Sequence, residues 1–208
     1  MVGVAIGESM GYQRAGFSRR RALKIFGRPR LRYSVLRGRS YGSHTQQVLL
    51  TAQALLNSRS DLRCYRTMFQ WRLSWYLLSL PMRFKKTTGV NSASATAATR
   101  ALFSALAVNG TGHRLSRWIE EATKVTHNNP LAIAGCQMLA FLAEYGATAR
   151  PTFDPLKALQ ETIDSCTHPD IKQGLCEIRP FLENSRSPSA VARHFGWDRG
   201  IPSSIGSV

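Results

Sequence analysis

The sequence predicts an all-α protein, an orthogonal helical bundle, and two observations lead to this class. Apolar residues recur at helical spacing in the long segments, and no run shows the sustained alternation of apolar and polar residues that is typical of a half-buried strand. Small residues on several apolar faces allow helices to pack closely. With 208 residues and 43% hydrophobic residues, the chain is long enough for an ordinary core, so we expect one domain over residues 1–208.

The helices follow from their caps and breakers. Gly27 is placed to end an early helix, and Asn129 and Asp154 are placed to cap later ones, each followed by a proline at the first helical position. The strong helix after Asp61 carries two tryptophans four residues apart, which we expect in the core. The predicted helices cover residues 2–12, 19–26, 43–56, 61–80, 98–106, 115–124, 130–145, 155–166, 169–183 and 188–195.

A polar turn that feeds into an amphipathic helix stands out at residues 38–56. Ser43 is placed as the N-cap, and Gln46 completes a Ser-x-x-Gln capping box. A helix start offers free N–H groups and partial positive charge, so it suits an anion or the edge of a metal site. Taken locally, Ser43, His44 and Thr45 equally fit a helix start with no further role.

The charge of the chain is unusual in size and in distribution. The net charge is +16, and from Ser9 to Ile119 the only acidic residue is Asp61. A basic half favours polyanions such as nucleic acid, nucleotide or poly-ADP-ribose, although a basic soluble surface or an acidic protein partner fits the same charge. We find no motif that reads nucleic-acid sequence, and charge alone is independent of sequence.

Four cysteines without a Cys-x-x-Cys spacing lie in apolar helical patterns, and we expect them to be buried free thiols in a reducing compartment. The N-terminus lacks the basic and apolar regions of a signal peptide. No stretch approaches the ~20 apolar residues of a membrane span. We therefore expect a cytoplasmic protein without a membrane partner.

Five segments in order along the chain resemble motifs of the ADP-ribosylglycohydrolase family. The first is Val-Gly-Val-Ala-Ile-Gly-Glu-Ser-Met-Gly, the later ones include Gly-Val-Asn-Ser-Ala and Thr-His-Asn-Asn-Pro, and the set occupies residues 2–11, 17–27, 43–46, 89–93 and 126–130. The resemblance implies the all-α fold of that family. It also implies an ancestral activity, hydrolysis of the glycosidic bond between ADP-ribose and a protein side chain or ribose, with two magnesium ions that position the ribose and a water.

The resemblance also assigns candidate metal and catalytic positions. The family begins this helix with Asp-Asp-Thr, whereas here Ser43 and His44 replace the two aspartates and only Thr45 is retained. Magnesium prefers charged oxygen ligands, so we expect weak magnesium binding or none. Glu8 stands where the family has Asp, and could orient a water or a ribose hydroxyl. As a structural group it would instead pair with Arg14 or Arg19.

On the ligand side, the resemblance implies that Gly89, Asn91, Ser92 and His127 border the ADP-ribose pocket. A histidine beside a helix start is also commonly a capping or buried hydrogen-bonding group. Residues 94–100 replace the family's Gly-Asn-Gly-Pro-Ala-Met-Arg, and only the Arg and one Ala agree. Side chains at the two former glycines would crowd the ligand.

Three functions remain open at this stage. The first is a family hydrolase whose activity is impaired, because the family's later Asp-Thr-Asp metal motif also has no counterpart before Val208. On this basis we expect a C-terminally short member that lacks the family's last helices. The second is a catalytically inactive protein that binds ADP-ribose or a related nucleotide. The third is a basic interaction protein that binds nucleic acid or an acidic partner.

Overall fold

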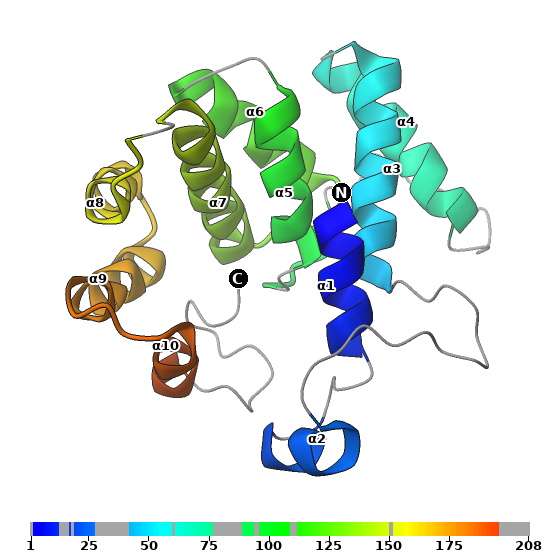
Figure 1. Ribbon diagram of the computed structural model, residues 1–208. Helices are drawn as coiled ribbons and strands as arrows, with labels where there is room; N and C mark the ends of the chain where they lie inside the picture. The colour runs from blue at the N-terminus through cyan, green and yellow to red at the C-terminus, as the bar shows by residue number, and fades with distance from the viewer. Residues whose placement is uncertain are drawn as a thin grey trace.

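The computed structural model describes residues 2–12, 17, 19–27, 42–59, 61–76, 89–93, 96–108, 112–149 and 152–195. Within these ranges the chain forms ten helices and no strand, with one isolated parallel bridge between Val90 and His127 (Figure 1). The all-α class is confirmed. The helices are α1 (Val2–Tyr12), α2 (Arg19–Phe26), α3 (Ser43–Ser58), α4 (Leu62–Tyr76), α5 (Thr96–Ala107), α6 (Gly112–Lys124), α7 (Pro130–Thr148), α8 (Pro155–Ser165), α9 (Pro169–Glu183) and α10 (Pro188–Phe195).

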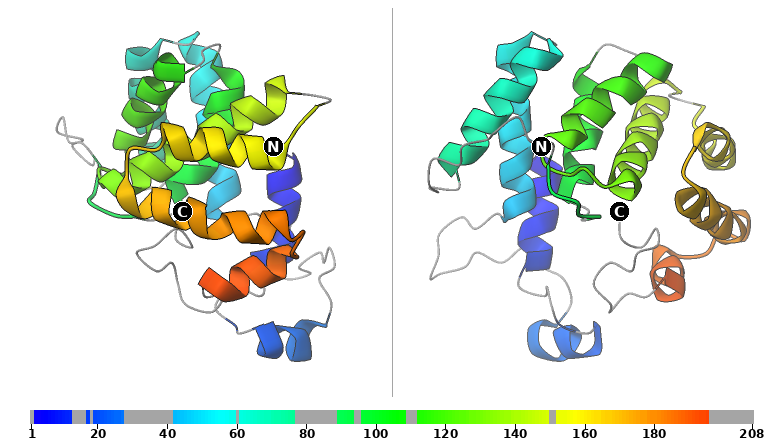
Figure 2. Two further views of the ribbon diagram at one scale, coloured as in Figure 1. Left: turned by 90° about the vertical axis from the view of Figure 1, so that its left-hand side faces the viewer. Right: turned by 180° about the vertical axis from the view of Figure 1, so that it is seen from behind.

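The core lies around α5, α6 and α7, with α3 and α4 on one side and α8 to α10 on the other (Figures 1 and 2). One cluster of buried side chains joins α3 to α7. At its centre Tyr65 and Phe69 of α4 stack with ring centroids 5.8 Å apart, and Tyr65 also meets Trp118 of α6 at 4.8 Å. Burying aromatic rings of this size supplies a large part of the hydrophobic stabilisation of the bundle.

A second cluster joins α7 to α8 and α9, so α7 belongs to both halves of the core. This 19-residue helix is the one in the described part of the chain that is long and apolar enough to cross a membrane. We had expected no segment close to the ~20 apolar residues of a membrane span, and α7 comes close to that length. Seven of its residues are buried between its neighbours, and a central core helix is apolar for that reason alone.

Several predicted helix ends are confirmed by their caps. Oδ1 of Asn129 accepts a hydrogen bond from the Leu131 N–H at 2.9 Å at the start of α7. Oδ1 of Asp154 accepts from the N–H groups of Leu156 and Lys157 at the start of α8. Gly27 follows α2 with a φ of 68°, a left-handed conformation that glycine adopts without strain.

The predicted cap of α3 is wrong. Ser43 is the first residue of the helix, Gly42 is the N-cap, and Gly42 has no side chain to accept a bond. The Gln46 N–H already donates to the Gly42 carbonyl at 3.2 Å, so it is not available to a serine cap. The free N–H groups of this helix start are instead satisfied from α1, by Glu8.

Two expectations about burial also need correction. Trp71 is 55% exposed, because the inward face of α4 is set by Tyr65 and Phe69, and a residue two positions beyond Phe69 points about 200° around the helix. The continuation of this helix over residues 77–80 lies outside the described residues. All four cysteines are free, but Cys176 is exposed on α9, whereas Cys136 and Cys166 are buried as expected.

Candidate functional site

A short extended segment, residues 89–92, lies against the turn that precedes α7. The Gly89 N–H donates to the Lys124 carbonyl at 2.7 Å, and the Val90 N–H donates to the Thr126 carbonyl at 3.0 Å. In return the Val90 carbonyl accepts from the Asn128 N–H at 2.9 Å. These bonds join the two motif segments that the sequence places 37 residues apart, Gly-Val-Asn-Ser and Thr-His-Asn-Asn, into one unit.

Gly89 is required by this close approach. A Cβ at this position would lie 2.0 Å from the carbonyl carbon of Thr126 and 2.4 Å from the His127 nitrogen. Both atoms belong to backbone that the bridge holds in place, so they cannot move aside as the end of a side chain could. Gly89 therefore sets the distance between the two segments.

Side chains extend this contact to the surface. Nδ2 of Asn129 donates to Oδ1 of Asn91 at 2.8 Å, while Oδ1 of Asn129 caps α7. Asn91 is exposed and Ser92 is half-buried. The structure thus places Gly89, Asn91 and Ser92 beside His127, which are the four predicted ligand-binding residues. Their role in binding remains a prediction.

His127 is held by a chain of hydrogen bonds that runs from Arg100 through Thr126. The Arg100 guanidinium of α5 donates to Oγ1 of Thr126. A guanidinium can only donate, so the Thr126 hydroxyl accepts this bond and keeps its own proton for another partner. Nδ1 of His127 lies 2.8 Å from this hydroxyl. The Thr126 hydroxyl can donate to Nδ1, which leaves the ring proton on Nε2, or accept from Nδ1–H through its second lone pair, which leaves Nε2 as an acceptor.

The same surroundings keep His127 neutral. Burial and the nearby Arg100 charge lower the pKa of His127 from 6.5 to about 4. A neutral imidazole with Nε2–H offers a hydrogen-bond donor at that nitrogen. Nε2 has no hydrogen-bond partner among the described residues. Neutral His127 can therefore offer Nε2 to a ligand, as a donor to a ribose or phosphate oxygen when the proton is on Nε2, or as an acceptor from a hydroxyl when the proton is on Nδ1.

Glu8 occupies the other side of the site. Its Oε1 accepts from the His44 N–H at 3.0 Å, and its Oε2 accepts from the Thr45 N–H at 2.8 Å. One carboxylate thus satisfies two free N–H groups at the start of α3, and it joins α1 to α3 where the two helices run side by side (Figure 1). Arg14 and the Arg19 side chain, its expected ion-pair partners, lie outside the described residues.

The hydrogen bonds decide the ionisation of Glu8. Burial raises the pKa of its carboxyl, but bonding to Thr45 and to the His44 N–H outweighs burial and lowers it below 4.5. Oγ1 of Thr45 is close enough to contribute to this shift, yet it makes no hydrogen bond of acceptable geometry and is fully buried. Among the described residues, Oγ1 of Thr45 therefore lies near the Glu8 carboxylate without a hydrogen bond of acceptable geometry.

The first turn of α5 connects the two sides. Oγ1 of Thr99 lies 3.2 Å from Nδ1 of His44, and the next residue, Arg100, bonds to Thr126. The sequence motifs assign no role to either residue. A signal for Arg100 was present, because it is a charged residue on the small apolar face formed by Ala97, Ala101 and Ser104.

The described residues do not fit a binuclear magnesium site. Near Thr45 they provide one carboxylate, Glu8, and both of its oxygens already bond to backbone N–H groups. No group of three or more His, Cys, Asp or Glu in the described ranges could hold a metal ion. The side chain of Ser43, and residues Ser94 and Thr96 whose side chains were predicted to crowd the ligand, lie outside the described side chains. Weak magnesium binding remains a prediction.

Comparison with known proteins identifies the relationship. The sequence model of ADP-ribosylglycohydrolases matches residues 1–207, nearly the whole chain. No curated protein matches the chain. The family match spans α1, α3, the bridge and the start of α7, which are the elements that form the site described above. The chain belongs to the ADP-ribosylglycohydrolase family.

Proposed function

We propose that this family member recognises the ADP-ribosyl group at the junction of residues 89–92 and 126–129, and that its hydrolysis of the glycosidic bond is impaired. The observation that carries the proposal is the bidentate capping of α3 by Glu8. Each Glu8 oxygen already accepts one N–H bond, so about half of its lone-pair sites are used, and no other carboxylate among the described residues joins it in a group that could hold a metal. The junction of residues 89–92 and 126–129, where ADP-ribose is proposed to bind, does not depend on Glu8.

Recognition rests on groups that suit ADP-ribose, which carries a diphosphate, two riboses and an adenine. Nε2 of His127, in the tautomer that carries its proton there, and the Nδ2–H groups of Asn91 are donors that suit phosphate and ribose oxygens. The carbonyl and N–H groups of residues 89–92 that pair with the 126–128 turn hold these donors in a fixed relation. Such preorganisation lowers the ordering cost of binding.

Impairment rests on the chemistry of the metal positions. The family activity uses magnesium to position the ribose and a water, and magnesium is held mainly by carboxylates. Ser43 and His44 provide no anionic oxygen, and Nδ1 of His44 already faces Thr99. The groups of residues 89–92 and 126–129 can bind and orient a ligand. The carboxylates that would hold a metal to activate water are missing at positions 43 and 44.

Calorimetric titration with ADP-ribose, in the presence and absence of magnesium, tests both parts. We expect binding that magnesium does not change, and weakening by at least tenfold in His127→Gln, because a buried donor to the ligand is altered. Glu161→Gln, on the exposed face of α8, is the matched control and should bind as the wild type does. Magnesium-dependent binding accompanied by turnover would contradict the impairment.

A restoring variant tests the metal argument directly. In Ser43→Asp/His44→Asp the two family carboxylates return, and acidic residues in the first turn of α3 are also favourable to the helix. We expect this variant to bind ADP-ribose with a magnesium dependence that the wild type lacks. Equal behaviour of the two proteins would place the cause of impairment elsewhere in the chain.

The basic charge supports an alternative, binding of a polyanion or an acidic partner. Most of the arginines before residue 42 lie outside the described residues. The net charge of the sequence is therefore the observation that supports this alternative. Polyanion binding would weaken steeply with salt and ignore ADP-ribose. If the titration shows no ADP-ribose binding while RNA or DNA binds with such a salt dependence, this alternative replaces the proposal.

A further inference from the structure

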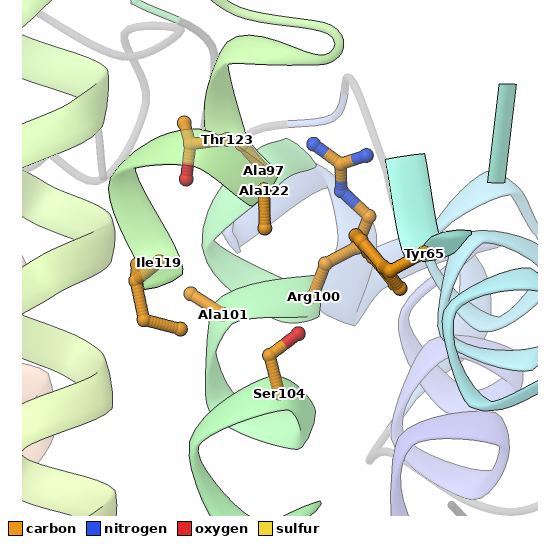
Figure 3. A pocket seen from close by; sticks show the side chains of 8 residues that line it. All are labelled: Tyr65, Ala97, Arg100, Ala101, Ser104, Ile119, Ala122 and Thr123. Atoms are coloured by element: carbon orange, nitrogen blue, oxygen red, sulfur yellow. The ribbon is translucent and has the colours of Figure 1, made fainter. Parts of the chain in front are cut away.

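Arg100 is a buried cation whose one hydrogen bond among the described residues leads from the core to the 126–129 turn. Its side chain is 3% exposed, and its guanidinium lies over the Phe69 ring, 4.7 Å from the ring centroid. One terminal nitrogen donates to Oγ1 of Thr126, whereas Nε and the other terminal nitrogen have no hydrogen-bond partner. Figure 3 shows the guanidinium turned away from the Ser104 hydroxyl, toward the end of α5 at which Ala97 lies.

Stability alone does not account for a cation at this position. Within the described ranges no carboxylate forms an ion pair with Arg100. The ionisable groups that interact with it, Tyr65 and Cys136, are neutral at physiological pH because burial raises the pKa of each. An apolar side chain of similar volume would fill the same space without the cost of burying a charge. The bond to Thr126 is therefore the contact that an apolar residue could not replace.

Thr126 connects Arg100 to the junction of residues 89–92 and 126–129. Its carbonyl accepts from the Val90 N–H at 3.0 Å, which is one bond of the bridge. Its hydroxyl accepts from Arg100 and lies 2.8 Å from Nδ1 of His127. Through this one residue, helix α5 is joined both to the bridge and to the imidazole ring.

We propose that Arg100 is a positioning residue for ligand binding, which holds the His127 ring through Thr126 and whose charge acts on that ring. Arg100 itself is too deeply buried to contact a ligand. This role rests on the proposed function, because it concerns the same site, and it adds α5 to the elements on which recognition depends. A ring that is held before the ligand arrives lowers the ordering cost of binding.

The charge of Arg100 acts on the ionisation of His127. Burial and then the Arg100 charge lower the pKa of His127 to about 4. Arg100 is the only charged residue of α5, and the extended segment of the junction and the first turn of α7 carry no charged side chain. Lys124, at the end of α6, is paired with Glu120 and Glu121. The ring therefore stays neutral at physiological pH and presents the same Nε2 to a ligand.

An NMR titration of the His127 ring, with its signals assigned by their loss in His127→Gln, tests an effect that a merely structural role would not produce. In the wild type the ring should titrate near pH 4. In Arg100→Met the midpoint should move upward, toward 6.5, because burial remains and the charge is gone. Arg100→Lys keeps the charge and should stay closer to the wild type. An unchanged midpoint in Arg100→Met would overturn the proposal.

Thr126→Val tests the hydrogen-bonded link without a change in the α5 core. Valine has a similar shape but cannot accept from Arg100, so the calorimetric affinity for ADP-ribose should fall by about tenfold. Thr162→Val is the matched control and should bind as the wild type does, because the Thr162 hydroxyl is also buried but bonds to the Ala158 carbonyl of its own helix α8.

The Arg100→Met/Thr126→Val double variant shows whether the two residues act as one link. Its loss of affinity should be smaller than the sum of the two single losses, because each single change already breaks the same connection. Additive losses would show that Arg100 and Thr126 act independently and would overturn the proposal.

The outcomes distinguish this role from the proposed function. If the wild type binds no ADP-ribose, the proposed function fails, and the NMR titration still decides whether the Arg100 charge acts on the His127 ring. If the wild type and Thr126→Val bind ADP-ribose equally well, the proposed function stands and the positioning role of Arg100 is refuted.

Discussion

The two sides of the candidate site are held by different kinds of interaction. On the ligand side, residues 89–92 pair with 126–128 through backbone hydrogen bonds, and side chains add to that frame. On the side that corresponds to the family's metal positions, called the metal side below, a single carboxylate, that of Glu8, holds the start of α3 through two bonds. One side depends on backbone geometry and the other depends on the chemistry of one side chain.

Because of this difference, some residues of the site are informative about the fold and others about ligand binding. Gly89 is needed for the bridge itself, so its presence indicates that the fold is intact and says little about ligand binding. Asn91 and His127, which bring donors to the surface of the frame, are the more informative residues. On the metal side a helix start can be capped by one carboxylate, so the aspartates of the family can be replaced without loss of the fold.

Gly89→Ala should have the largest effect on the ligand side. The added Cβ would lie 2.0 Å from a backbone carbon of Thr126, so the two segments must separate. We expect a loss of about 3 kcal/mol in the free energy of unfolding, in the upper range for overpacking. Urea denaturation measures it, and ADP-ribose binding should be lost in the variant that still folds.

The matched control is Gly146→Ala in α7. Its Cβ would meet nothing nearer than the Phe153 ring at 3.8 Å, and alanine favours a helix interior by about 0.5–1 kcal/mol. This variant should therefore be slightly more stable than the wild type. Equal stability of the two alanine variants would mean that the 89–92 segment does not pair with the turn as described.

The ionisation of His127 gives the next largest effect. The folded protein protonates His127 only near pH 4, whereas the unfolded chain does so near 6.5, so the unfolded state binds more protons between these values. Stability should therefore rise with pH across this window, by about 2 kcal/mol. In His127→Gln this part of the pH dependence should be absent, as urea unfolding at several pH values would show. Identical pH profiles would place the His127 ring in water.

Helices were predictable from the sequence because their signals are local. Asn129 and Asp154 cap their helices as expected, since a side-chain oxygen two residues before an N–H needs no distant partner. The start of α3 was misjudged for the opposite reason. Its cap comes from Glu8, 36 residues earlier, and local spacing carries no information on such a contact.

The candidate site was predictable where a motif brought its residues together and not where packing did. Gly89 and His127 were found through the family motifs, whereas the roles of Thr99 and Arg100 depend on α5 lying between α3 and the 126–129 turn. The orientation of α4 was misjudged similarly, because Trp71 and Phe69 are equally apolar and only the packing against Trp118 selects the inward face.

Glu8→Gln tests the metal side with a smaller effect. The amide keeps one acceptor but loses the charge, so two charge-assisted bonds become one neutral bond, at a cost of about 1 kcal/mol. Since the folded pKa of Glu8 lies below 4.5, its contribution is present above that pH and is lost as the pH falls through the folded pKa.

Urea unfolding at neutral and acidic pH separates this effect from that of His127. The stability difference between wild type and Glu8→Gln should persist from neutral pH down to about pH 5 and vanish in stronger acid. Glu161→Gln, in the exposed pair with Lys157 on α8, should show a change near zero throughout. If magnesium raised the stability of the wild type and left Glu8→Gln unchanged, Glu8 would be a metal ligand and the contrast between the two sides would fail.

Asn129→Asp should have the smallest effect on stability and a distinct effect on binding. The carboxylate keeps the cap on Leu131 but loses the amide that donates to Oδ1 of Asn91. The Asn91 side chain can recover the bond by turning its Nδ2 inward, so stability should change by less than about 0.5 kcal/mol.

After this turn, the Asn91 side chain would present its oxygen, in place of its N–H donor, to the ligand. We expect ADP-ribose affinity to fall by roughly three- to tenfold. Asn91→Ala should weaken binding to a similar extent, which calorimetry would show. Unchanged affinity in both variants would show that Asn91 does not contact ADP-ribose.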